Sequence, residues 1–260
     1  YRNIDIQTNG IALADAPDLL DELMTVGVTG LGISIDGLQE SHDAFRRQSG
    51  CFTKAVSASR AAVERGYTIT VSVVAHSGNF DEIPRLFDFV KREIKPRVFR
   101  VMTIDPIGRA EPDRQLLLSG EQLRQVIGFL QGEYQANCTT YCDPSVTMVE
   151  LGCGGWLGKD LEGTFRPMIF HCIAGIINLG ILYDGKLASC SNISREFIEG
   201  DLRTENIKRV WDTRYQCYRD SSWRKAGACA NCAEWDYCHG GPMHWSRQNQ
   251  INSCPFNNLQ

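Results

Sequence analysis

Residues 229–238 read CANCAEWDYC, and their three cysteines are spaced to bind a single metal centre. Cys229 and Cys232 are separated by two residues, so one tight turn can direct both thiolates at the same centre. Cys238 follows after five more residues, and Cys254 supplies a fourth thiolate from a returning segment. Four thiolates can hold a zinc ion or an iron–sulfur cluster, so this stretch predicts a metal centre and leaves the metal open.

Composition limits the class of protein. Of the 260 residues, 43% are hydrophobic and 22% are charged, as in a globular protein with a sizeable core. The net charge of -4, without a run of Lys or Arg, argues against a nucleic-acid partner, because phosphate binding needs a concentrated basic face. No apolar run approaches the roughly 20 residues that span a bilayer. The 11 cysteines are an odd number and cannot all pair within the chain, which favours metal binding in a reducing, cytoplasmic compartment.

The first part of the chain alternates between strand-like and helix-like patterns. We expect strands at residues 3–8, 31–35, 68–75 and 97–103. We expect one helix with Asp15 as its N-cap and two more at about 52–64 and 81–91. This alternation predicts an α/β fold with a parallel sheet. The chemistry of such folds lies at the C-terminal ends of strands, where this chain has the polar residues Asn9, Ser34 and Asp36.

The pattern changes after Asp105. A helix is expected at about 121–134, an aperiodic stretch at 137–171, and a β-hairpin at 176–189 that turns at Asp184-Gly185. We therefore divide the chain into an α/β part at 1–110, a linking region with a helix at 111–170, and a cysteine-rich α+β domain with a hairpin at 171–260.

A second pair of cysteines, Cys172 and Cys190, flanks the expected hairpin, and four residues separate Gly185 from Cys190. Together with the downstream cysteines, this order resembles the radical S-adenosylmethionine (SAM) enzymes that carry a C-terminal SPASM domain. The upstream half matches that family through TNG at 8–10, SIDG at 34–37, HDAFR at 42–46 and PIGRA at 106–110. The resemblance covers essentially the whole chain, and CAEWDYCHGGPMHW is most similar to the lipoprotein-associated members.

The resemblance implies a partial (β/α)6 radical SAM barrel that lacks its first two βα units, followed by a SPASM domain. It implies auxiliary 4Fe-4S clusters, one or two in this chain, and SAM in the intact enzyme. Such enzymes cleave SAM reductively to a 5′-deoxyadenosyl radical, which abstracts hydrogen from the substrate. A peptide or protein substrate and an electron donor such as flavodoxin or ferredoxin are the implied partners.

The chain departs from the family pattern in the cysteine region. The family has a further cysteine after Cys238, and Pro242 stands in its place here. Cys172 and Cys190 therefore need other partners at the first auxiliary cluster. Cys153 is the candidate third ligand, and His244 or His239 the candidate fourth, since imidazole can replace thiolate at such clusters. The alternative for both histidines is a solvated loop or a position next to the ligands.

The second departure is the absence of the CxxxCxxC motif that binds the SAM cluster. We expect this motif upstream of Tyr1, and we expect the chain by itself to be inactive, so no catalytic residue is assigned. The alternative function is a non-catalytic module that binds zinc or an iron–sulfur cluster through cysteines and serves stability or partner docking.

The family also implies contacts to SAM from the barrel half. We carry over Ser34, Asp36 and Asn9 at strand ends, with Arg46 and Arg60 as partners for the SAM carboxylate. The alternatives are a strand-end cap for the serine, a turn residue for the asparagine, and surface helix charges for the arginines.

Overall fold

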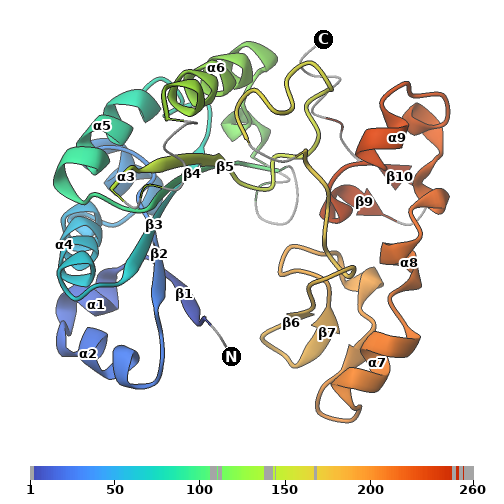
Figure 1. Cartoon of the computed structure of the whole chain (residues 1–260), viewed down its shortest axis with the longest axis horizontal. Helices are drawn as coiled ribbons and strands as arrows, with labels where there is room; N and C mark the ends of the chain where they lie inside the picture. The colour runs from blue at the N-terminus through green and yellow to red at the C-terminus, as the bar shows by residue number, and fades with distance from the viewer. Residues whose placement is uncertain are drawn as a thin grey trace. The chain divides into compact units, whose positions relative to one another are not determined.

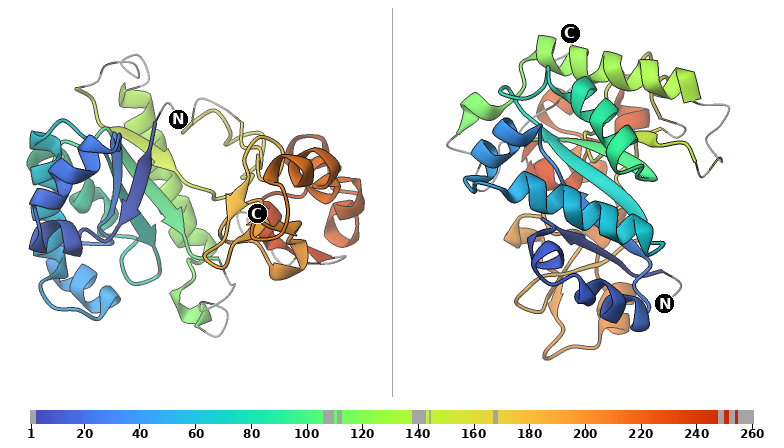
Figure 2. Two further views of the ribbon diagram at one scale, coloured as in Figure 1. Left: turned by 90° about the horizontal axis from the view of Figure 1, so that it is seen from below. Right: turned by 90° about the vertical axis from the view of Figure 1, so that its left-hand side faces the viewer.

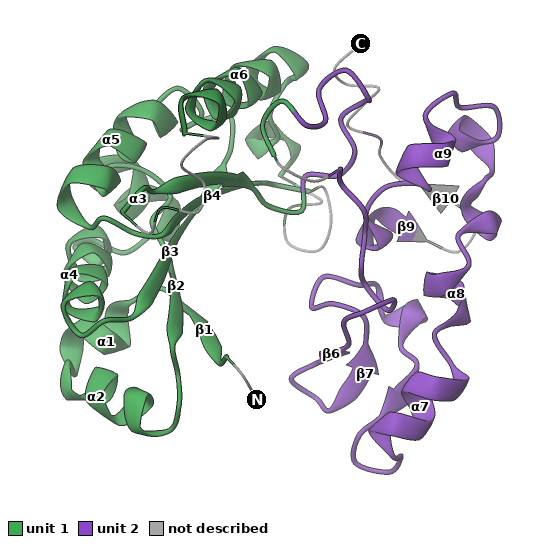
Figure 3. Ribbon diagram, viewed as in Figure 1, with its two compact units in different colours: residues 1–153, 164–167 green, residues 154–163, 168–260 purple. Residues whose placement is uncertain are grey.

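The computed structural model describes residues 3–105, 110, 113–137, 143, 145–166, 169–247, 250–251 and 254. It forms two compact units (Figure 3), residues 1–153 with 164–167 and residues 154–163 with 168–260. The first unit continues well past the boundary expected at residue 110. The reason is that α6 (Gly120–Asn137) and β5 (Met148–Leu151) extend its fold.

A five-stranded parallel sheet forms the centre of the first unit, with the strands in chain order. The strands are β1 (Asp5–Thr8), β2 (Gly30–Ser34), β3 (Thr68–Ala75), β4 (Val98–Thr103) and β5. The predicted α/β fold with a parallel sheet is therefore confirmed. The fifth strand falls in the stretch expected to be aperiodic, where it pairs with β4 and buries Val149 and Leu151.

Helices of the first unit lie along one side of its sheet (Figures 1 and 2). They are α1 (Ile11–Asp15), α2 (Asp18–Thr25), α3 (Gln39–Arg46), α4 (Cys51–Glu64), α5 (Ile83–Glu93) and α6. Ile33 and Val71 pair in register and are both 0% exposed, and Ile33 lies on the helix-covered side of the sheet, close to Gly10 of the turn before α1 and Ala58 of α4. None of the described helices has the length and apolarity needed to cross a membrane.

The start of the first helical region differs from the expected capping. Asp15 ends α1 and does not cap the following helix, whose N-cap is Pro17. The chain turns into a helix earlier because Gly10 adopts a left-handed conformation with φ of 78° directly after β1. A Cβ at Gly10 would lie only 3.1 Å from the Cα of Ala55, so the close approach of α4 also requires glycine.

A buried hydroxyl links α2 to the sheet and gives a first prediction. Tyr67 is 5% exposed and donates a hydrogen bond to the carbonyl of Leu20, which is 0% exposed. Tyr67→Phe leaves that carbonyl without its donor, so we expect a loss of about 1 kcal/mol in the free energy of unfolding. Urea denaturation measures it, and Tyr183→Phe is the control because Tyr183 is 97% exposed. Equal unfolding midpoints for the two variants would contradict the assignment.

The described part of the second unit contains a three-stranded antiparallel sheet, a two-stranded sheet and short helices. The three-stranded sheet comes first in the chain. Its strands are β6 (Gly180–Ile181), β7 (Lys186–Ala188) and β8 (Gly200–Asp201). The predicted hairpin is confirmed as β6 and β7, with Gly185 at φ of 78° in its turn. The remaining regular elements are α7 (Ile207–Thr213), α8 (Gln216–Arg219), α9 (Trp235–Cys238), β9 (Ser246–Arg247) and β10 (Gln250–Ile251).

An apolar cluster stabilises the second unit beneath its cysteine loops. Leu187 and Tyr215 are 0% exposed, and the Tyr215 hydroxyl donates to the carbonyl of Ala188 at 3.0 Å. Tyr218 donates to the carbonyl of Phe197 in the same cluster. Cys172 and Cys190 pack against the edge of this cluster, so the hairpin and its core fix the positions of both cysteines.

Candidate metal centre

The structure brings together the four cysteines with which the sequence analysis began. Cys229 ends a 3-10 turn at Gly227–Cys229, and Cys238 ends α9. Electrostatic interactions link the Cys229 thiol to those of Cys232 and Cys254, and the Cys238 thiol to those of Cys254 and Cys229. All four are partly buried, and none forms a disulfide.

The surroundings of these thiols fit a cationic centre. Burial, together with the neighbouring thiols of Cys254 and Cys229, raises the pKa of the Cys238 thiol to about 12. Burial also raises the pKa of Cys229, and Cys254 and Cys232 act in the same direction. Four thiolates would repel one another here unless a positive centre lay among them, and bound metal deprotonates thiol ligands for this reason. No three of these four thiols, all of which the structure describes, lie within 4.8 Å of one another, which is wider than the thiolates around one zinc ion, so the arrangement leaves room for the larger iron–sulfur cluster.

Left-handed backbone reverses the chain immediately after α9. His239, Gly240 and Gly241 have φ of 49°, 86° and 73°. The reversal points the carbonyls of residues 240–242 at Arg224, whose Nη2 donates to Gly241 at 3.0 Å and Pro242 at 3.2 Å, and also to Gly240. Arg224 is 6% exposed and interacts electrostatically with the thiols of Cys172, Cys238 and Cys229, although burial lowers the pKa of its guanidinium.

The second cysteine group gathers around the turn at Met243–Trp245. The backbone N–H of Met243 donates to the Cys172 sulfur at 3.3 Å. His244 is 6% exposed and is hydrogen-bonded to the Cys190 thiol. Burial acts to raise the pKa of Cys190, but the bond to His244 and further hydrogen bonds from its neighbours hold it below the usual value. Cys172, Cys190 and His244 thus meet at one turn.

A cavity of about 150 Å³ connects the two groups, because Cys172 and Cys238 both line it. Arg224, His171 and His239 also line it. The rings of the two histidines meet edge to face at 5.7 Å, and burial followed by the nearby His239 lowers the pKa of His171. His239 therefore lies near the cysteines, whereas His244 contacts one directly.

The remaining candidate cysteine ligand is less defined. Cys153 is exposed and belongs to the first compact unit, so its place in a ligand set stays a prediction. The pair Cys138 and Cys142 lies outside the described residues.

Two of the predicted SAM contacts are brought together at the end of β2. Asp36 is 0% exposed, and its Oδ2 accepts from the Arg46 Nε at 2.5 Å. Its Oδ1 accepts from the backbone N–H of Val74 at 3.0 Å, and its own N–H donates to Nδ1 of His42 at 2.9 Å. Both carboxylate oxygens therefore accept hydrogen bonds from within the first unit, and the buried carboxylate links Arg46 to the backbone of β3. Ser34 is the last residue of β2, two positions earlier.

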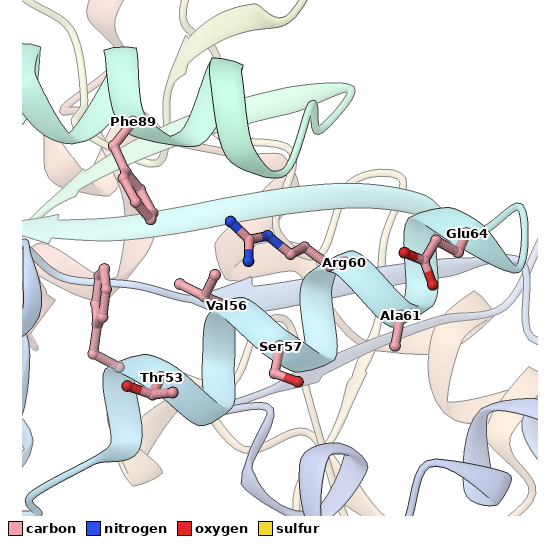
Figure 4. Close-up of a pocket in the computed structure, with 8 residues that line it drawn as sticks. Thr53, Val56, Ser57, Arg60, Ala61, Glu64 and Phe89 are labelled. Carbon is pink, nitrogen blue, oxygen red and sulfur yellow. The ribbon is translucent and has the colours of Figure 1, made fainter.

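The other two predicted contacts have local partners. Asn9 accepts at Oδ1 from the N–H of Ile11 at 3.1 Å, which is the role of a turn residue at the start of α1. Arg60 lies in a groove of about 550 Å³ between α4 and α5, lined also by Phe52 and Phe89 (Figure 4). Its Nε donates to the carbonyl of Glu93 at 2.9 Å, and its guanidinium pairs with the Glu93 carboxylate. Arg60 is therefore not gathered with Asp36 and Arg46, and all these roles toward SAM stay predictions.

Comparisons with known proteins decide the family. The iron–sulfur cluster-binding domain SPASM matches residues 172–233, a range that includes Cys172, Cys190, Cys229 and Cys232. The chain is 28% identical over 246 residues to the mycofactocin maturase MftC of Mycolicibacterium smegmatis, covering 92% of this chain and 58% of that one. This chain is a radical SAM protein with a SPASM domain.

Two further comparisons, one with a curated relative and one with a solved structure, show what this radical SAM/SPASM protein is similar to. It is 32% identical over 253 residues to the Fe-coproporphyrin III synthase of Methanosarcina barkeri, covering 90% of this chain and 62% of that one. The solved structure of native anSMEcpe with bound AdoMet and the Kp18Cys peptide has a TM-score of 0.65 at 15% identity, covering 98% of this chain and 70% of that one. The latter is a likeness of fold. The chain thus spans about three fifths of the length of the two curated relatives.

The family assignment answers the question that the cysteine spacing left open. SPASM domains bind iron–sulfur clusters, so the 4Fe-4S prediction is confirmed over zinc as the family's cofactor. Sequence reasoning did not single out Arg224. Its only signal is its place five positions before Cys229, and many surface arginines share such proximity.

Proposed function

We propose that this chain is the auxiliary-cluster part of an enzyme that cleaves SAM reductively and abstracts hydrogen from a peptide or protein substrate. The observation that carries the proposal is the convergence of four thiols, Cys229, Cys232, Cys238 and Cys254, within one unit. The SPASM match over residues 172–233 supports the same assignment from sequence.

Two sets of side chains would hold the clusters. Cys229, Cys232, Cys238 and Cys254 form the first set. Cys172, Cys190 and His244 belong to the second, for which Cys153 is the further predicted ligand. When bound, such clusters transfer single electrons at potentials set by their ligands, charge and burial. The described contacts of Met243 and His244 hold Cys172 and Cys190 in fixed positions, which prepares the second set for binding.

The barrel half would bind SAM at the C-terminal ends of its strands. Ser34 ends β2 and is half-buried, whereas Asp36 and Arg46 form an ion pair with each other. We assign these two a positioning role, since their ion pair fixes the loop after β2 beside Ser34. An external donor such as flavodoxin or ferredoxin would supply the electron.

The substrate class has two candidates. A peptide is favoured by the fold, because the anSMEcpe structure that this chain resembles holds a peptide. An iron tetrapyrrole is the second candidate, because the relative at 32% identity is an Fe-coproporphyrin III synthase. An absorption titration with Fe-coproporphyrin III separates them. A saturable shift of its main absorption band would favour the second candidate, and an unchanged spectrum would favour the peptide.

The function is tested on the anaerobically reconstituted 260-residue chain under reducing conditions with SAM. We expect it to bind iron and sulfide but to form no 5′-deoxyadenosine, because the sequence has no CxxxCxxC motif to bind the SAM cluster. Metal and sulfide analysis together with chromatography of the products measures both. Zinc without sulfide would instead support a non-catalytic docking module, and 5′-deoxyadenosine from this chain would contradict the expected inactivity.

A further inference from the structure

A buried positive charge lies between the two cysteine groups and has no acidic counterpart. Arg224 is 6% exposed, and no carboxylate lies within ion-pair distance of it in the described part of the chain. Burying an ion without an opposite charge costs several kcal/mol in real proteins. The charges that do act on Arg224 are the thiols of Cys172, Cys238 and Cys229. These groups are neutral while protonated and become negative when they bind a metal centre.

The hydrogen bonds of the Arg224 guanidinium point to the same conclusion. Nη2 of Arg224 donates hydrogen bonds to the carbonyls of residues 240–242. Nε is buried and has no hydrogen-bond partner among the described residues. A buried donor without an acceptor is costly and rare, so an acceptor is expected at this position. The side chain lines the same cavity as Cys172 and Cys238, where cluster or thiolate sulfur would lie.

We propose that Arg224 is the counter-cation of the iron–sulfur centres, with its Nε–H donating to a sulfur atom and its charge raising their reduction potential. This inference rests on the proposed function. Reduction adds one electron and hence one negative charge, and a fixed cation in the same low-dielectric region favours the more negative state. Hydrogen bonds to cluster sulfurs act in the same direction. The carbonyls of the loop after α9 hold Nη2 of the guanidinium in place. Nε takes no part in these bonds, so it is free to donate to a cluster or thiolate sulfur.

The experiment compares three variants of the full chain after anaerobic reconstitution, by redox titration followed with electron paramagnetic resonance. Arg224→Gln removes the charge, and Arg224→Lys keeps it without the guanidinium fork. Arg219→Gln is the matched control. Arg219 lines the same cavity but is exposed, and its guanidinium stacks 4.7 Å from the Trp211 ring.

We expect Arg224→Gln to change the ratio of oxidised to reduced cluster at fixed potential by tenfold or more, a lowering of about 59 mV for a one-electron couple. The reduction potential of Arg224→Lys should lie at least halfway back from that of Arg224→Gln to that of the wild type. The potential of Arg219→Gln should differ from that of the wild type by less than a third of the Arg224→Gln shift. Normal cluster content with an unchanged potential in Arg224→Gln would overturn the inference. If Arg224→Gln fails to hold clusters, Arg224→Lys decides the question. A tenfold change in the ratio of oxidised to reduced cluster in Arg224→Lys, which is a potential lowered by about 59 mV, would overturn the inference.

The same experiment separates this inference from the function on which it rests. A wild-type chain that takes up no iron and sulfide refutes the proposed function. A wild-type chain that binds clusters, with variants that do not differ from the control, refutes only the role of Arg224.

Discussion

Cys229→Ala is expected to lower the iron and sulfide content of the reconstituted chain, by at most about four atoms of each, the content of one 4Fe-4S cluster. The variant removes one of four thiols that interact within a single partly buried site. The three that remain, Cys232, Cys238 and Cys254, would leave one iron without a protein ligand. Cluster content is measured by colorimetric iron and sulfide assays on anaerobically handled protein.

Cys217→Ala is the matched control for this prediction. Cys217 lies in the same unit, but its thiol donates to Glu199, and burial raises its pKa to about 12. It interacts with none of the four clustered thiols in the contacts described above, so its loss should leave iron and sulfide unchanged. Equal losses from both variants would indicate general unfolding of the unit, and an unchanged content in Cys229→Ala would refute its role as a ligand.

Asp36→Ala is expected to lower the free energy of unfolding by about 3 kcal/mol. This value lies at the low end of the losses in free energy of unfolding that follow when one partner of a buried ion pair is removed. The low end applies because Arg46 is 33% exposed, so solvent can partly replace its lost partner. The N–H of Val74 also loses its acceptor, the Asp36 Oδ1 at 3.0 Å. Urea denaturation of the full chain measures the change.

Asp15→Ala provides the comparison for Asp36. Asp15 also forms an ion pair with a basic side chain, Lys54 at 2.7 Å, but both groups are well exposed. Exposed pairs contribute little to stability, so this variant should unfold close to the wild type. If Asp36→Ala were as stable as Asp15→Ala, the carboxylate would not be a structural element, and a direct role toward SAM would become the better explanation.

The strands with long β-branched runs could be predicted from the sequence, and short elements could not. TITVSVVA at residues 68–75 is β3 over its whole length, because a run this rich in β-branched residues favours an extended strand. The expectation of burial on both faces holds only in part, since Thr68 is exposed and Thr70 and Val74 are half-buried. By contrast, β5 has four residues, too few to show a period, and only pairing with β4 defines it. The early turn at Gly10 depends on the approach of Ala55, a contact far away in sequence.

The same distinction holds at the metal centre. Cysteine spacing predicted that Cys229 and Cys232 lie close together, because two intervening residues restrict the geometry of any fold, and their thiols do interact. Their role as ligands of one cluster stays a prediction. The spacing could not predict Arg224, since its position depends on the left-handed turn after Cys238, whose carbonyls accept its hydrogen bonds. Nor could it predict that Arg60 pairs with Glu93, a residue on another helix.

The central claim is that loops of one unit converge to hold an iron–sulfur centre. Anomalous X-ray scattering at the iron edge, from crystals of the anaerobically reconstituted chain, tests it most directly. The account predicts one group of iron atoms bonded to the sulfurs of Cys229, Cys232, Cys238 and Cys254 together. Iron elsewhere with these four thiols unbound, or zinc alone among them, would contradict it.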